Sequence, residues 1–157
     1  MSEKRDEEYF VLKLTALIKA NLNTKIAEIN ARKSDGIELD LVDSGAYYYM
    51  SFGQSVPAFD PVVIFLVDSD QGEQAAGTSS EVVTVGVQMV ISDKMEPNTE
   101  NLYRRTVRYR RALKEVVRDG YAPFQGFQLV SLPDVPFIVG RQSYMALGIG
   151  VQFSFAN

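Results

Sequence analysis

The end of the sequence alternates between large apolar and small or polar residues, a pattern that predicts one long β-strand over residues 143–155. The large apolar positions are Met145, Leu147, Ile149, Val151, Phe153 and Phe155. The positions between them hold Ala146, Gly148, Gly150, Gln152 and Ser154. Because successive side chains of a strand point to opposite faces, one face of this strand is apolar and the other is small and polar. Such a strand is typical of an antiparallel sheet that is covered on one side only.

Two other segments predict the helices that would cover that side. The first runs from Tyr9 to Ala31 and the second from about Glu100 to Asp119. In the first, apolar residues recur about every 3.6 positions and therefore share one face: Val11, Leu14, Ile18, Leu22, Ile26 and Ile29. In the second, the core stripe is Leu102, Thr106, Tyr109, Leu113, Val116 and Val117. Ser34-Asp35-Gly36 and Gly120 are the expected stop signals.

Shorter apolar and β-branched runs predict the remaining strands at residues 46–52, 62–67, 81–92 and 127–132. Residues 37–45 are expected to be irregular, and residues 68–80, rich in Asp, Ser, Gln and Gly, are expected to form a long loop. The order helix, strands, helix, strands predicts a single α+β domain over residues 1–157. Its sheet is expected to be antiparallel, with a mixed sheet as the alternative, and to carry both helices on one face.

The composition excludes several kinds of chemistry. The sequence contains neither Cys nor His, which removes thiol nucleophiles, disulfides, Cys/His zinc sites and imidazole catalysis. The acidic run from Asp68 resembles the start of a calcium loop, but Glu73 and Ser79 stand where that loop needs Gly and Glu. Gly148 and Gly150 lie inside a strand, so they are expected to admit a close neighbour rather than to bind phosphate. We therefore expect no enzyme activity, no cofactor and no metal.

The cellular location follows from two further features. The N-terminus is charged and lacks the apolar run of a signal peptide. The longest apolar stretch, residues 62–67, is far shorter than the roughly 20 residues that cross a bilayer. We therefore expect the protein to fold in the cytoplasm and to contact no membrane.

Charge is distributed unevenly along the chain, although the net charge is only −4. Residues 34–100 contain twelve acids and a single Lys, a net of −11. Residues 101–120 contain seven bases and two acids, a net of +5. Asymmetry of this kind within one domain bears on its partners rather than on its fold.

Four of these bases share the side of the second helix that lies opposite its core stripe: Arg104, Arg108, Arg111 and Arg118. Three interpretations stay open for them: a solvated face, contact with a nucleic-acid backbone, or docking against an acidic protein surface. The net charge and a pI of about 4.9 argue against a dedicated nucleic-acid binder. If identical subunits pack head to tail, the acidic segment offers a partner and the contact would close into a ring. Arg108→Glu is then expected to abolish assembly and to leave the monomer folded.

The order of these elements, with the acidic loop and the Arg-rich helix from Leu102 to Leu113, resembles the tail terminator proteins of tailed bacteriophages, also called tail completion or neck terminator proteins. The resemblance implies a structural virion protein of the tail and neck, assembled in the host cytoplasm. It implies a ring, usually a hexamer, at the head-proximal end of the tail tube. There the ring ends tail polymerisation and joins the tail to the head connector. The resemblance supplies no catalytic residue.

The resemblance also implies partners: further copies of the chain, the tail tube protein, the head–tail connector protein, and genomic DNA that passes through the lumen without specific binding. We expect the acidic loop, with Asp68, Asp70 and Glu73, to lie at the lumen or at the tube-facing surface. An acidic lumen would keep the DNA phosphates from binding. Two alternatives remain: another phage neck or head-closure protein, or a small regulatory protein that binds a partner or nucleic acid through its Arg-rich helix.

Overall fold

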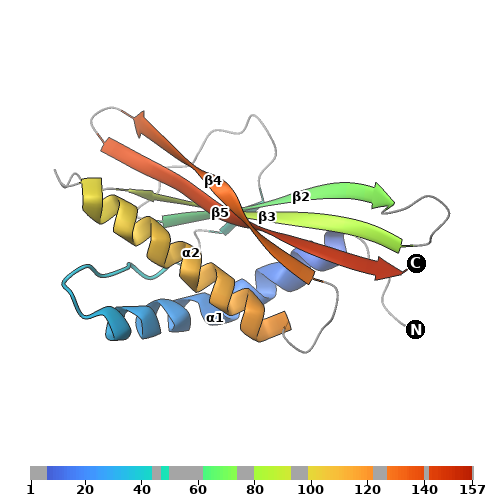
Figure 1. Ribbon diagram of the computed structural model, residues 1–157, viewed down its shortest axis with the longest axis horizontal. Coiled ribbons are helices and arrows are strands. Elements are labelled where there is room, and N and C mark those ends of the chain that lie inside the picture. Colours follow the sequence, from blue (N-terminus) through green and yellow to red (C-terminus); the bar gives the residue numbers. More distant parts are fainter. Residues whose placement is uncertain are drawn as a thin grey trace.

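The computed structural model of the chain describes residues 7–43, 47–49, 62–73, 80–92, 99–121, 127–139 and 142–156. These residues form two helices, α1 (Glu7–Lys33) and α2 (Thr99–Tyr121). They also form the strands β1 (Tyr47–Tyr49), β2 (Val62–Glu73), β3 (Ser80–Ser92), β4 (Phe127–Val139) and β5 (Gln142–Ala156). The strands build one twisted sheet, and both helices lie against the same face of it (Figure 1). The predicted α+β class is confirmed.

The sheet is mixed, with its strands in the order β1-β2-β3-β5-β4. β1 pairs with β2 in parallel, whereas every other neighbouring pair is antiparallel. The two long central strands, β3 and β5, carry the core. Val85 is the register partner of Val151 and Val87 that of Ile149, and all four side chains are fully buried. The large apolar side chains of β5 from Leu147 to Phe153 are buried as predicted, but Ala146, Gly148 and Gly150 on the opposite face are buried as well, so the expectation of a sheet covered on one side only is wrong at these positions.

The apolar stripes of both helices are buried against this sheet, as predicted. In α1 the stripe from Leu14 to Ile29 is at most 1% exposed. In α2 all six predicted stripe positions are buried. α1 ends at Lys33, where expected. Ser34 and Gly36 adopt positive φ angles of 40° and 84°, which are incompatible with continuing a right-handed helix.

α2 does not end at Gly120 as predicted, because it continues to Tyr121. Gly120 instead sits where α2 approaches α1. A Cβ at this position would lie only 2.5 Å from the methyl groups of Leu17. The missing side chain therefore permits close helix packing and does not provide a left-handed cap.

Three strand boundaries differ from the prediction. β2 continues through Asp68 to Glu73, so residues 68–73 are not part of a loop, and a register shift lies between Asp70 and Gly72. The backbone hydrogen bonds of the β2–β3 pair do not require apolar side chains, which is why composition alone gave the wrong boundary.

β4 also extends beyond its predicted end, because it continues to Val139, through Pro133 and Pro136. It is an edge strand, where a proline leaves one less N–H to satisfy. The strand predicted at residues 46–52 corresponds to β1, which is described at residues 47–49. Residues 46 and 50–52 of that prediction lie outside the described part.

Of the two glycines of β5, Gly148 admits a close neighbour, as the sequence predicted for both, whereas Gly150 does not. A Cβ at Gly148 would clash with the backbone oxygen of Val87 and lie 3.1 Å from Cδ1 of Leu132. At Gly150 the nearest atoms, on Thr84, Leu132 and Val130, would be at ordinary contact distances. Side chains of β4 thus fold over the glycine face of β5, on the side of the sheet away from the helices.

Candidate functional site

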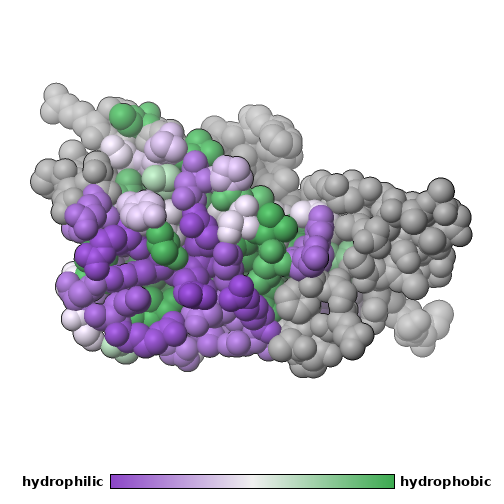
Figure 2. Space-filling view, viewed as in Figure 1, coloured by the Kyte–Doolittle hydropathy of each residue, from purple (hydrophilic) through white to green (hydrophobic). Residues whose placement is uncertain are grey.

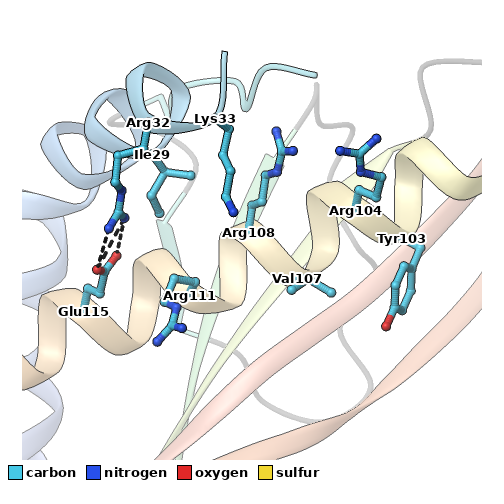
Figure 3. Close-up of a pocket in the computed structure, with 9 residues that line it drawn as sticks. All are labelled: Ile29, Arg32, Lys33, Tyr103, Arg104, Val107, Arg108, Arg111 and Glu115. Atoms are coloured by element: carbon cyan, nitrogen blue, oxygen red, sulfur yellow. Dashed lines mark hydrogen bonds and ion pairs between the residues drawn. The ribbon is translucent and has the colours of Figure 1, made fainter. Parts of the chain in front are cut away.

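A groove of about 890 Å³ lies between the C-terminal end of α1 and the outward side of α2. We call it the basic groove, and Figure 3 shows the side chains that line it. They are Ile29, Arg32, Lys33, Tyr103, Arg104, Val107, Arg108, Arg111 and Glu115. Five of these nine residues are cations and one is an acid. The surface over the two helices is mostly hydrophilic, with small hydrophobic areas between the polar ones (Figure 2).

Two of the arginines are held by one acid in the turn that follows α1. Arg104 Nη2 lies 2.6 Å from Asp35 Oδ2, and the guanidinium of Arg108 forms a bidentate ion pair with the same carboxylate. Arg108 also donates a hydrogen bond of 2.7 Å to the backbone oxygen of Ile37. The hydrogen bond from Arg108 lowers the pKa of Asp35 well below its ordinary range. These contacts fix the positions of both guanidinium groups.

The role predicted for Arg108 is therefore wrong in one respect. Its side chain is only 8% exposed and it binds Asp35 of its own chain, so it does not lie on a solvated face. Arg108→Glu would place a carboxylate against Asp35 in a buried position, and it would destabilise the monomer as well as any assembly. The helix wheel missed this because it treats α2 alone, whereas α1 and the turn after it cover one flank of the helix.

The other predicted site residues divide into two groups. Arg104 and Arg111 line the basic groove with Arg108, whereas Arg118 is exposed and lies outside it. Sequence reasoning missed the cations that α1 contributes, Arg32 and Lys33, although basic residues in the last turn of a helix are a recognisable signal. It also missed the apolar part of the groove.

The cations of the groove differ in whether an acid neutralises them. Arg32 is paired with Glu115 across the two helices, with 3.0 Å between Nη2 and Oε2. Within the described part of the chain, Lys33 and Arg111 make neither an ion pair nor a hydrogen bond. These two residues provide the unmatched positive charge of the groove.

Apolar surface accompanies that charge. Tyr103 is 60% exposed and Val107 is 41% exposed on the same side of α2. In Figure 3 Tyr103 lies toward the end of the drawn part of α2 that is far from the Arg32–Glu115 ion pair. The groove therefore offers cations and an exposed aromatic side chain together, which suits an anionic partner that also carries apolar or planar groups.

Residues 37–43 run beside α1 as an extended segment held by side chains. Asn30 accepts a hydrogen bond from the N–H of Leu39 and donates one to its carbonyl oxygen, at 2.8 and 3.0 Å. Asn23 makes the same two bonds to Val42. The segment is irregular, as predicted, but these bonds pin it in place and anchor the turn that carries Asp35. The sequence signal was the seven-residue spacing of the two asparagines, which puts them on one face of α1.

Acidic residues occur in the second half of β2 and at the start of β3. We call Asp68, Asp70 and Glu73 of β2, with Glu81 of β3, the acidic strand end. Glu73 and Glu81 are direct register partners. β2 ends and β3 begins at one end of the long axis of the molecule, while α1 ends and α2 begins toward the other (Figure 1). The structure therefore separates the predicted acidic residues from the basic groove.

Two other kinds of site are absent from the described ranges. No group of three or more Asp and Glu residues there could hold a metal ion. No helix among those residues is long and apolar enough to cross a membrane. No family model matches the chain, and no curated protein matches it either.

Proposed function

We propose that this protein is a structural subunit that forms a ring at the head-proximal end of a phage tail tube. The ring ends tail polymerisation and joins the tail to the head connector. The observation that carries the proposal is the separation of charge along the long axis, with the basic groove toward one end and the acidic strand end at the other. Regions of opposite charge in the sequence of one subunit suit identical copies that repeat one contact around a closed ring.

The order of elements also supports this function. One helix, three strands, a second helix and two strands is the order on which the resemblance to tail terminators rested. Both helices cover one face of the sheet, so each subunit has a helical side and a strand side (Figure 1). In the proposed ring, which we take to be a hexamer, the remaining surfaces contact the tail tube and the connector, and DNA passes through the lumen without specific binding.

A second candidate function is favoured by one observation, that the exposed Tyr103 lines the same groove as Arg104 and Arg111. An aromatic side chain next to cations is the arrangement on which single-stranded nucleic acids stack. A regulatory protein that binds nucleic acid would use this surface. The net charge of −4 disfavours it, because binding to phosphates depends mainly on positive charge.

The experiment that tests the proposal adds the purified protein to tail-tube protein while it polymerises. We expect tubes of shorter and more uniform length, each with extra density at one end in electron micrographs. The capped tubes should then join to heads that carry the connector. Tubes that grow without limit in the presence of the folded protein would contradict the proposal.

A further inference from the structure

We propose that the basic groove binds an acidic, extended segment of a partner protein. The segment that fits there carries carboxylates together with an apolar side chain. The inference goes beyond the proposed function and does not depend on the ring, because it concerns one copy of the protein and a separate ligand. It rests on the charge of the groove, on the carboxylates that its arginines already bind, and on the apolar side chains along it.

The groove has an excess of positive charge. Its five cations face two acids, Glu115 in the lining and Asp35 beside it, which leaves a net charge of +3. Two of the cations, Lys33 and Arg111, make neither an ion pair nor a hydrogen bond within the described part of the chain. Positive charge of this kind, concentrated in a groove, attracts an anionic ligand.

The contacts inside the protein show that the arginines here bind carboxylates. Arg108 forms a bidentate ion pair with Asp35, and about two turns further along α2 Arg32 binds Glu115. The planar guanidinium group matches the geometry of a carboxylate, which makes such pairs specific as well as strong. Figure 3 shows Lys33 between the Arg32–Glu115 pair and Arg108. A carboxylate from a partner would therefore bind between two arginine–carboxylate contacts that the chain makes itself.

The groove has room for a short extended segment. Its lining on α2 runs from Tyr103 to Glu115, which at about 1.5 Å per residue is a length of roughly 18 Å. An extended chain of about five to six residues spans that length. Asp35 holds Arg104 and Arg108 in fixed orientations, so a ligand that contacts them orders little that is not already ordered.

Apolar side chains lie on the same stretch of α2. Tyr103 is 60% exposed and Val107 is 41% exposed. Both line the groove, and because they are four residues apart they lie on one side of the helix. A segment with acidic residues and an apolar side chain matches both parts of this surface, whereas a purely acidic segment matches only the cations.

The same features favour a protein segment over nucleic acid. Glu115 and Asp35 place carboxylates in and beside the groove, and the whole chain has a net charge of −4, so a row of phosphates meets repulsion as well as attraction. Tyr103 is the one aromatic residue among those that line the groove. Single-stranded nucleic acids stack successive bases on several aromatic side chains, which this lining does not offer.

Fluorescence anisotropy with synthetic peptides tests the proposal. The probe is a fluorescein-labelled peptide of about six residues that alternates Glu and Leu. Three comparison probes are the same peptide with Lys in place of Glu, the same peptide with Ser in place of Leu, and a labelled oligothymidylate of similar length. Each is titrated with the purified protein at low and at high salt.

A double variant with a matched control identifies the groove as the binding surface. Lys33→Glu with Arg111→Glu reverses the charge of the two cations that have no described partner. Lys13→Glu with Arg118→Glu is the control, since it makes the same two changes at exposed positions of α1 and α2 outside the groove. Circular dichroism checks that both variants fold. If the groove variant does not fold, Lys33→Gln with Arg111→Gln replaces it.

We expect the wild-type protein and the control variant to bind the Glu–Leu peptide saturably, and more weakly as the salt concentration rises. The groove variant should bind it about tenfold or more weakly, because like charges then face each other. The Lys-containing peptide should not bind. Tyr103→Ala should weaken binding of the Glu–Leu peptide and leave binding of the Glu–Ser peptide unchanged.

Several results would overturn the proposal: no saturable binding of the Glu–Leu peptide to the wild type, or equal affinities of the groove and control variants. Tighter binding of the oligothymidylate would assign the groove to nucleic acid. A native mass that falls only in the groove variant, without peptide binding to the wild type, would assign it to a second copy. The assay uses no tail tubes, so tubes that grow without limit would contradict the proposed function and leave the peptide site standing.

Discussion

The guanidinium of Arg108 is buried against the carboxylate of Asp35, and this pair binds the middle of α2 to the turn that ends α1. A third residue, Arg104, shares the same carboxylate. The most central arginine of the predicted docking face is therefore a structural residue. The charge left for a partner comes mainly from Lys33 and Arg111, which have no described ion pair.

The Asp35 pair should make stability depend on pH in the acid range. The pKa of Asp35 is below its ordinary value of 3.8, chiefly because of the hydrogen bond from Arg108. The pair therefore stabilises the fold above that pH, and the stabilisation is lost as the pH falls below it. We expect the free energy of unfolding to decrease more steeply below about pH 4 in the wild type than in Asp35→Asn. Urea unfolding from pH 7 to pH 2.5 measures this, and parallel curves would refute it.

The hydrogen bonds from Asn23 and Asn30 that hold residues 37–43 beside α1, which we call the clamp, give a second prediction. Asn30→Ala removes both partners of the Leu39 backbone, and we expect it to lower the free energy of unfolding by about 1–3 kcal/mol. Asn21→Ala is the matched control, because the exposed Asn21 side chain bonds only to the Leu17 oxygen within its own helix. Its effect should stay within about 0.5 kcal/mol. Chemical denaturation compares the two, and equal effects would show that the clamp contributes nothing.

Most of the fold was predictable from the sequence because it depends on the burial of periodic apolar residues. The stripe of α1 and the alternation of β5 each place their side chains on one face whatever the rest of the chain does. The end of β2 was not predictable in this way. Residues 68–73 pair through their backbones, and their polar composition is typical of a loop.

Tyr109 gives a third prediction, since its hydroxyl closes the clamp from α2. It accepts a hydrogen bond from the N–H of Asp40 and donates one to its carbonyl oxygen. Burial raises the pKa of this phenol, so we expect it to ionise only when the protein unfolds in alkali. Tyr109→Phe should cost about 1–2 kcal/mol of stability. An absorbance titration with alkali should lose its last, unfolding-coupled step in the variant; an unchanged titration would count against this role.

The glycines of β5 give a fourth prediction with a control built into the strand. A Cβ at Gly148 would meet the backbone oxygen of Val87, which cannot move without disturbing β3, whereas at Gly150 the nearest atom would be 3.6 Å away. We expect Gly148→Ala to destabilise the protein by about 1–3 kcal/mol and Gly150→Ala to change it little. Thermal unfolding of the two variants measures the difference. Equal melting temperatures would mean that the strands adjust freely.

The candidate site was predictable only in part, for a physical reason. The sequence placed Arg104, Arg108 and Arg111 on one side of a helix, and the structure brings all three to the basic groove. Which of them is free for a partner depends on Asp35, which lies far away in the sequence. The turn that carries Asp35 is positioned by Asn30 and its neighbours, and no local pattern reports such a tertiary contact.

The measurement that tests the central claim most directly is the native mass of the purified protein, taken by light scattering, with negative-stain images of the same sample with and without tail tubes. The proposed function predicts a ring near six subunits, or a monomer that forms rings only at the ends of added tubes. A stable monomer or dimer that ignores tail tubes and binds nucleic acid instead would contradict it.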